Sequence, residues 1–275
     1  MGTLYLVATP IGNLEDITLR ALRILQEARL IAAEDTRRTG RLLAHFNIET
    51  PQTSYFEHNK LVKIERILQA LGEGDVALVS DAGMPGLNDP GYELVRAALL
   101  AGYAVSPVPG PSAPLAALVS SGLPTDAFLY LGYLPRKSGE RQRLLESVLD
   151  LPYTLVFLET PHRLLAALAD LQEVLGNRPA VVARELTKLH EEIRRGPLRE
   201  QAAYFQENPP RGEFTLVVAG QSSQPQRWSP DVLQTALEQA LHSGVPLAQA
   251  AGELAEQSGW PRREIYRRLV KLQND

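Results

Sequence analysis

The chain has 275 residues, of which 44% are hydrophobic and 22% charged, and it contains no cysteine. This length allows two modest domains, and the lack of cysteine excludes disulfides, thiolate metal ligands and thiol nucleophiles. A net charge of -4 argues against a wholly basic nucleic-acid coat, so contacts to nucleic acid would have to come from local clusters. Without a membrane-length apolar run or a secretion signal, we expect a soluble, cytoplasmic protein with no membrane partner.

In the first half, short apolar runs alternate with amphipathic segments. The runs predict buried strands at residues 4–8, 30–33, 76–79 and 103–108. Helical spacing of apolar residues predicts helices from residue 18, around residues 42–46, and over 59–71 and 92–98. Alternating strands and helices indicate an α/β fold with parallel strands.

The strand at 76–79 is followed by SDAGMPGLNDPG, residues 80–91. Its three glycines, two prolines, asparagine and two aspartates favour a shaped loop over a flexible one. Ligands of open α/β sheets lie beyond the carboxyl ends of the strands, so this loop is a candidate ligand site. The alternative is a tight strand-to-helix connection. Residues 109–113 form a second constrained loop after a strand, and the two loops together predict a cleft.

Residues 121–126 interrupt this pattern and mark our domain boundary. New strands are predicted at 128–131, 154–158, 180–183 and 214–218, and a basic loop at 132–139. A polar linker over 220–228 then precedes a helical unit. We expect an α/β domain at 1–121, a second α/β domain at 122–220 and the helical unit at 229–275.

The helical unit has the spacing of a helix-turn-helix. Apolar faces on two helices flank a turn at Ser258 and Gly259, and the second face includes Ile265, Tyr266 and Leu269. The second helix is rich in cations that can meet phosphates. The alternative is a helical hairpin with a solvated charged face.

Common catalytic motifs are missing. The chain has no Gly-x-Gly-x-x-Gly after a strand, no Gly-Lys-Ser/Thr phosphate loop and no Gly-x-Ser-x-Gly elbow. The five histidines are dispersed without a metal-ligand spacing, so we expect no metal site. What remains is a cleft of shaped loops flanked by arginines.

Several blocks together resemble one known family. They are TPIGNL at 9–14, EDTR at 34–37 with Thr39 and Gly40, the 80–91 loop, and PGPS at 109–112. In this order they resemble the tetrapyrrole methylase superfamily, and within it the branch of ribosomal RNA small subunit methyltransferases I. The similarity continues through 159–163, 183–188, 212–213 and the helical unit, so it covers nearly the whole chain.

The resemblance implies a two-domain α/β enzyme, usually a homodimer, that holds S-adenosylmethionine in a cleft between the domains. It implies methylation of a ribose 2′-hydroxyl on a cytidine in the decoding region of small-subunit (16S) rRNA, either bare or in the assembled subunit. Two alternatives remain: a tetrapyrrole or protein methyltransferase on the same fold, and a non-catalytic RNA-binding assembly factor. The cation-rich second helix of the helical unit argues against a small-molecule substrate.

The expected site residues fall into three groups. For methyl transfer to the weakly nucleophilic hydroxyl, Glu34 and Asp35 are candidate bases. Arg37 and Lys188 are candidate electrostatic stabilisers, and a lysine could be the base only if desolvation lowered its pKa. Candidates for cofactor binding are Pro10, Asp81, Ala82, Gly83, Met84, Pro85, Gly110, Ser112, Ala113, Phe157, Ala183 and Glu213. Candidates for RNA binding are Arg38, Arg41, Arg136, Lys137, Arg262, Arg263, Arg267, Arg268 and Lys271.

Overall fold

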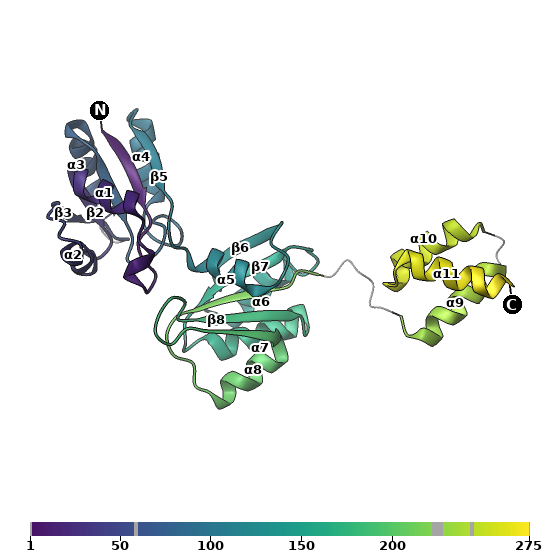
Figure 1. Ribbon diagram of the computed structural model, residues 1–275. Helices are drawn as coiled ribbons and strands as arrows, with labels where there is room; N and C mark the ends of the chain where they lie inside the picture. The colour runs from purple at the N-terminus through teal and green to yellow at the C-terminus, as the bar shows by residue number, and fades with distance from the viewer. Residues whose placement is uncertain (1, 58–59, 222–227, 243–244, 275) are drawn as a thin grey trace. The chain divides into compact units, whose positions relative to one another are not determined.

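The computed structural model describes residues 2–57, 60–221, 228–242 and 245–274 of the chain. Most of the expected linker, residues 222–227, lies outside the described residues. The chain forms two compact units (Figure 1). One comprises Met1–Leu149 with Tyr153–Ala219, and the other Asp150–Pro152 with Gly220–Asp275.

The first unit begins with a five-stranded sheet whose strands are all parallel, in the order β3-β2-β4-β1-β5. Its strands are β1 (Thr3–Val7), β2 (Leu30–Ala33), β3 (Gln52–Ser54), β4 (Val76–Val79) and β5 (Ala104–Val108). Four of them match the predicted apolar runs. The fifth, β3, was not predicted because its three residues, Gln-Thr-Ser, form no apolar run.

Helices cover both faces of this sheet, as a doubly wound α/β fold requires. They are α1 (Leu19–Glu27), α2 (Thr36–His45), α3 (Lys60–Glu73) and α4 (Tyr92–Leu100). Side chains of α1 and α2 pack with Ile31 and Ala33 of β2, whereas those of α3 and α4 pack with Leu30 and Ala32. Alternate side chains of one strand therefore pack in two separate hydrophobic cores, one on each face of the sheet. Asn59, the first residue of the helix predicted over 59–71, lies outside the described residues.

A second five-stranded sheet has the order β6-β7-β10-β8-β9. Its strands are β6 (Phe128–Tyr133), β7 (Thr154–Glu159), β8 (Pro179–Arg184), β9 (Glu192–Pro197) and β10 (Phe214–Val218). Only β6 and β7 pair in parallel; the other pairings are antiparallel. The sequence pattern did not predict β9, because Glu-Ile-Arg-Arg-Gly-Pro is a polar edge strand.

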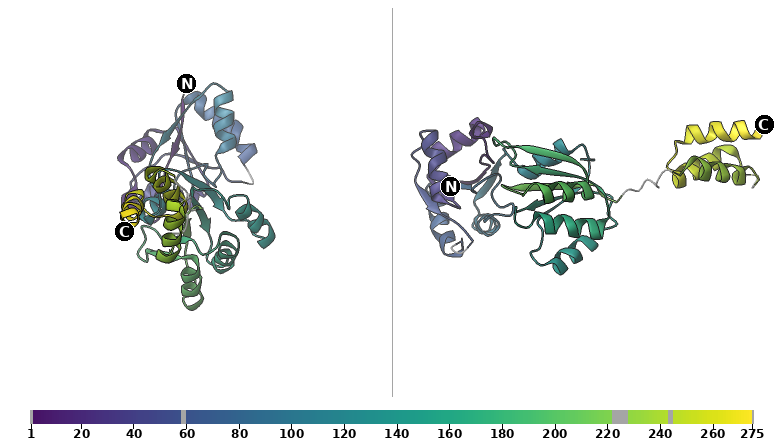
Figure 2. Two further views of the ribbon diagram at one scale, coloured as in Figure 1. Left: turned by 90° about the vertical axis from the view of Figure 1, so that its right-hand side faces the viewer. Right: turned by 90° about the horizontal axis from the view of Figure 1, so that it is seen from below.

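One helix, α5 (Ala113–Ser121), packs on a face of the second sheet against Val156, Val181 and Val217. The remaining helices of this part are α6 (Ser138–Glu146), α7 (Leu164–Leu175) and α8 (Leu198–Glu207). Figure 2 shows these three helices side by side, and neighbouring pairs are in contact. A short 3-10 helix, η1 (Leu14–Asp16), follows β1.

The second unit is helical and has a core of its own. It contains α9 (Pro230–His242), α10 (Leu247–Ser258) and α11 (Arg262–Asn274). Leu237, Leu254 and Leu269, one from each helix, belong to a single buried cluster. Gly259 ends α10 with a φ of 66°, the left-handed conformation that favours glycine at a helix C-terminus. The predicted helix-turn-helix is therefore present, except that Tyr266 is 44% exposed instead of lying on the apolar face.

Candidate functional site

The loops that follow β1 and β4 are joined at the carboxyl edge of the first sheet. The amide of Thr9 donates to the carbonyl of Gly83, and the amide of Gly83 donates back to Thr9, both at 2.9 Å. Gly83 has a φ of 79°, which a residue with a side chain rarely adopts. The two loops therefore form one structural wall.

The loops after β2 and β4 are also joined, through carboxylates. The Asp81 amide donates to Glu34 Oε2 at 3.2 Å, and the Asp35 amide donates to Asp81 Oδ1 at 3.1 Å. Arg38 Nη1 lies 3.2 Å from Asp81 Oδ2. Because these contacts hold the carboxylates by backbone groups on both loops, the charges are fixed in position rather than mobile.

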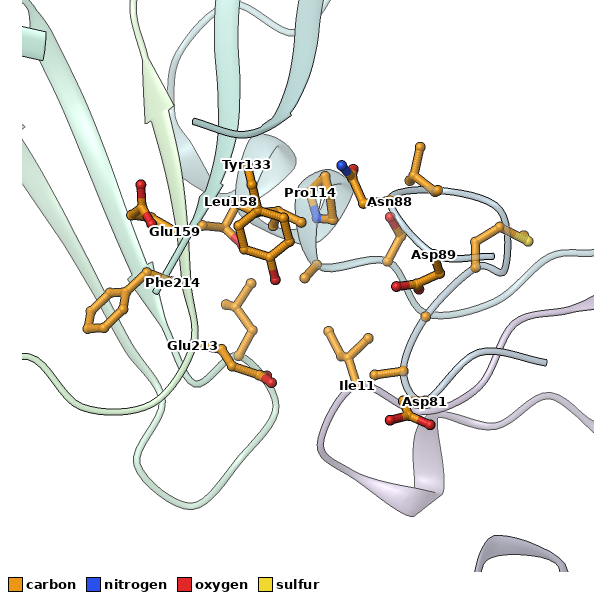
Figure 3. Close-up of a pocket in the computed structure, with 18 of the residues that line it drawn as sticks. Ile11, Asp81, Asn88, Asp89, Pro114, Tyr133, Leu158, Glu159, Glu213 and Phe214 are labelled. Carbon is orange, nitrogen blue, oxygen red and sulfur yellow. The ribbon is translucent and has the colours of Figure 1, made fainter. Parts of the chain in front are cut away.

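A cavity of about 280 Å³ lies between these loops and the second sheet. Figure 3 shows Asp81 and Asp89 on one side of it, with Tyr133 and Glu213 on the other. Five carboxylates and one guanidinium are among the described residues that line it: Glu34, Arg38, Asp81, Asp89, Glu159 and Glu213. The apolar part of the lining consists of Ile11, Leu87, Leu158, Leu186 and Phe214 with smaller residues. Such a cavity suits a ligand with both a positive charge and an apolar ring.

Burial raises the pKa of three carboxyls in the cavity. Burial is the largest influence on Glu34 and on Asp81, and the pKa of each lies above its ordinary value. For Asp89, burial and the nearby Glu34 charge raise the pKa to about 6. A bound cation would offset this crowding of negative charge, because an opposite charge favours the ionised carboxylate.

The Asp89 carboxyl gives a pH-dependent prediction for cation binding. Because its pKa is about 6, Asp89 is mostly neutral at pH 5 and mostly charged at pH 7. The affinity for the cationic S-adenosylmethionine should therefore rise across this range, and Asp89→Asn should remove most of that rise. Isothermal titration calorimetry at pH 5, 6 and 7 measures the dissociation constant of S-adenosylmethionine for the unaltered chain and for Asp89→Asn.

The matched control for this experiment is Glu65→Gln, which changes an exposed carboxyl on α3 outside the cavity. It should keep the same pH dependence as the unaltered chain. An unchanged pH dependence in Asp89→Asn would remove Asp89 as its source.

Asp35 and Arg37 pair with each other instead of lining the cavity. Asp35 caps α2 by accepting the Arg37 amide at 2.8 Å, and its carboxylate lies 2.7 Å from Arg37 Nη2. Hydrogen bonds from the Arg37 side chain and backbone hold the pKa of Asp35 well below its usual range. Such a carboxyl is a weak base, so Glu34 fits the proposed proton acceptor better than Asp35 does.

Lys188 is held in a separate cluster. Its Nζ lies 2.9 Å from Glu185 Oε1 and 2.8 Å from Glu213 Oε2. Burial lowers the pKa of Lys188, but hydrogen bonds and charge from Glu213 and Glu185 outweigh it, so that the pKa lies above the ordinary value. Lys188 is therefore a charged group held between Glu185 and Glu213, and Glu213 lines the cavity.

Asn88 connects the 80–91 loop to the second sheet. The Tyr130 hydroxyl donates to Asn88 Oδ1 at 2.5 Å. Gly132 has a φ of 63°, and a Cβ there would collide with the Asn88 amide. The loop thus reaches from the first sheet to β6 and closes one end of the cavity.

The structure brings together most of the predicted cofactor residues. Those that line the cavity are Asp81, Ala82, Gly83, Met84, Ser112, Ala113, Ala183 and Glu213, together with Glu34 and Arg38 from the other two groups. Those outside its lining are Pro10, Pro85, Gly110, Phe157, Asp35, Arg37 and Lys188. Phe157 is fully buried, whereas Gly110 lies next to the wall, where a Cβ would come 2.9 Å from that of Ala8.

Sequence reasoning did not select several residues of the cavity. The polar ones are Asn88, Asp89, Tyr130, Tyr133, Glu159 and Thr215. Asn88 and Asp89 lie inside the 80–91 loop, which the sequence predicted as a ligand site. The composition of the loop indicated the site, but it did not show that these two side chains line it. Tyr130 and Tyr133 belong to a strand, and nothing in an apolar run shows which side chains face a ligand.

The predicted RNA-binding residues lie in three places. Arg38 and Arg41 are on α2, next to a second cavity of about 200 Å³ that also contains Pro10. Arg136 and Lys137 are exposed before α6. The five cations of α11 complete the set.

On α11, the cations differ in their contacts. Arg262 donates to the Ala248 carbonyl at 3.0 Å, and Arg268 lies over the Trp260 ring and pairs with Glu264. The exposed Arg263, Arg267 and Lys271 make no ion pair within the described part of the chain. These three, with the exposed Tyr266 on the same helix, are the side chains available to a partner.

Within the described ranges, no group of three or more histidine, cysteine, aspartate or glutamate side chains is arranged to hold a metal ion. None of the described helices combines the length and apolarity needed to cross a bilayer.

Comparison with protein families gives two matches. Residues 3–202 match the Tetrapyrrole (Corrin/Porphyrin) Methylases, and residues 228–273 match the RsmI C-terminal HTH domain. The second match covers the three helices of the second unit and agrees with their helix-turn-helix geometry.

Curated relatives match over the whole length. A protein of Synechocystis named ribosomal RNA small subunit methyltransferase I is 50% identical, with 100% of both chains covered. A protein of the same name from Escherichia coli O157:H7 is 46% identical over 99% of this chain and 96% of its own.

Solved structures support the fold of the first unit. A uroporphyrin-III-C-methyltransferase from Thermus thermophilus superposes with a TM-score of 0.55 at 25% identity, covering 80% of this chain and 94% of its own. A complex of such an enzyme with S-adenosyl homocysteine is similar in fold, with a TM-score of 0.54 at 22% identity and coverage of 78% and 97%.

Proposed function

The chain belongs to the tetrapyrrole methylase family, and from that premise we propose that it methylates the ribose 2′-hydroxyl of a cytidine in the decoding region of small-subunit rRNA. It is an S-adenosylmethionine-dependent methyltransferase. The observation that supports the choice of RNA is the full-length match to proteins named ribosomal RNA small subunit methyltransferase I, which includes the helical unit with its cation-rich helix α11.

The residues of the cavity fit the cofactor. S-adenosylmethionine has a sulfonium and an ammonium, and the cavity offers five carboxylates against one guanidinium. Its adenine needs an apolar surface, which Ile11, Leu158 and Leu186 supply. When bound, the cofactor would supply an electrophilic methyl group to the ribose oxygen. The sulfur–carbon bond would break as the carbon–oxygen bond forms, which leaves a neutral thioether. The hydroxyl proton would pass to a base of this chain.

This chain contributes position and charge to the transfer. The fixed loops orient the reacting groups, which is the main source of acceleration for a weak nucleophile. We assign proton acceptance from the hydroxyl to a carboxylate of the cavity, Glu34 or Asp89. Their raised pKa values lie closer to neutral pH than that of Asp35, and a base works best when its pKa is near the working pH.

The homodimer remains part of this proposal. Four aliphatic side chains on α4 and α5 are at least half exposed and are our candidates for the subunit interface. They are Leu99, Leu100, Leu115 and Val119. Light scattering on the purified full-length chain measures the oligomeric state.

Two experiments separate the proposal from its alternatives. Equilibrium dialysis with labelled S-adenosylmethionine should detect binding, and absence of binding would leave only a non-catalytic assembly factor. Incubation with labelled cofactor and rRNA should then place label in the RNA. Label in a tetrapyrrole or a protein, with none in RNA, would favour the other methyltransferases of this fold.

A further inference from the structure

The second cavity lies beside the first and shares two residues with it. Arg38 and Asp81 line both, and the remaining wall comes from the segment after β1, from α2 and from Ser80 after β4. Its volume of about 200 Å³ is smaller than the 280 Å³ of the first cavity. It suits one part of a larger molecule whose remainder lies outside.

The two cavities have opposite charge. The first has an excess of carboxylates, whereas two guanidiniums and one carboxylate line the second, from Arg38, Arg41 and Asp81. Asp81 is already paired with Arg38 at 3.2 Å. Arg41 is therefore the unbalanced charge, and the second cavity favours an anion next to a site that favours a cation.

Donors in the second cavity are available to a ligand. Arg41 is exposed and makes no ion pair with any described residue. Thr39 is only 4% exposed, yet its hydroxyl has no hydrogen-bond partner in the described part of the chain. Because the Thr39 oxygen is not among the buried side-chain atoms that lack a partner, water satisfies it in the free protein, and a ligand in the cavity would replace that water.

The same cavity has an apolar side. Pro10, Leu14 and Leu42 also line it, and Leu14 is 40% exposed. An apolar surface beside an arginine and a free hydroxyl matches a nucleotide, which has a flat base and a phosphate.

We propose that the second cavity is the subsite for the acceptor nucleotide, with Arg41 at its phosphate, Thr39 donating to it, and Leu14 and Leu42 against its base. This placement leaves the ribose at the Arg38–Asp81 boundary, facing the first cavity. The inference rests on the proposed function, and it changes the expected role of Pro10 from cofactor to acceptor binding.

The test uses the full-length chain saturated with S-adenosyl homocysteine and cytidine 5′-monophosphate as the probe. Arg41→Gln should weaken binding of the probe about fivefold or more, since a charged hydrogen bond contributes about 1.5–3 kcal/mol. Thr39→Val, which keeps the shape and removes the hydroxyl, should weaken it about two- to fivefold. The matched control, Arg20→Gln, alters an exposed arginine outside both cavities and should change nothing.

Two further measurements assign the outcomes. The dissociation constant of S-adenosyl homocysteine should stay within about twofold in both variants. In rRNA methylation, Arg41→Gln should raise KM more than it lowers kcat.

Unchanged probe binding in both variants, or no probe binding by the unaltered chain, would overturn the subsite. If rRNA were still methylated in that case, the proposed function would stand. If the variants weakened binding of S-adenosyl homocysteine as much as binding of the probe, the cavity would belong to the cofactor site and the subsite would be overturned. Arg41-dependent probe binding without any methylation of RNA would support the subsite and defeat the proposed function.

Discussion

Replacement of Asp81 by alanine should weaken S-adenosylmethionine binding about tenfold to a hundredfold. The change removes a charge from the cavity and leaves the Asp35 amide and Arg38 without their partner, and losing a charged hydrogen-bond partner costs about 1.5–3 kcal/mol. Each 1.4 kcal/mol corresponds to about a tenfold change in the dissociation constant. Isothermal titration calorimetry of the full-length chain measures it.

A second variant separates charge from local structure. Asp81→Asn keeps an oxygen that can accept from the Asp35 amide, so it should retain the loop geometry and lose only the charge. It should bind the cofactor more weakly than the unaltered chain and more tightly than Asp81→Ala. The control Asp126→Ala changes an exposed carboxyl outside the cavity and should have no effect. Unaltered affinity in both Asp81 variants would exclude Asp81 from the cofactor site.

Removal of residues 221–275 should weaken RNA binding at least about tenfold and leave the cofactor affinity unchanged. The second unit has its own buried cluster, so its loss does not open the cores of the first unit. Filter binding of rRNA at several salt concentrations measures the effect. The salt dependence should also become shallower, because each lost phosphate contact removes about 0.7 from the slope for single-stranded RNA.

Substitutions within α11 separate the loss of RNA contacts from the loss of the unit's stability. The triple change of Arg263, Arg267 and Lys271 to serine removes three exposed cations and should lower the salt slope by about two. Arg268→Ser, in contrast, removes a contact to Trp260 within the unit and should mainly lower its thermal stability. Equal RNA affinity in the shortened chain would defeat the nucleic-acid-binding role of the helical unit.

Much of the fold followed from apolar patterning. The first sheet was predictable because strands buried on both faces, such as β2 and β4, consist of unbroken apolar residues. The strands β3 and β9 were missed because edge strands carry polar residues. The antiparallel pairing of β10 with β7 and β8 was also out of reach, because residue periodicity is the same for both pairing directions.

The candidate site was predictable as loops and less so as side chains. The glycines and prolines of 80–91 marked a shaped connection, and its position after β4 located it at the sheet edge. The pairing of Asp35 with Arg37 and of Lys188 with two glutamates depends on three-dimensional contacts. The same holds for Asp89, whose raised pKa reflects burial and the nearby charge of Glu34, a residue from another strand's loop.

The most direct test of the central claim is nucleoside analysis after methyl transfer. The full-length chain is incubated with methyl-labelled S-adenosylmethionine and either bare small-subunit rRNA or assembled small subunits, and the RNA is digested to nucleosides. The account predicts that the label is recovered in 2′-O-methylcytidine. Recovery of the label on a base, or on the ribose of another nucleoside, would contradict it.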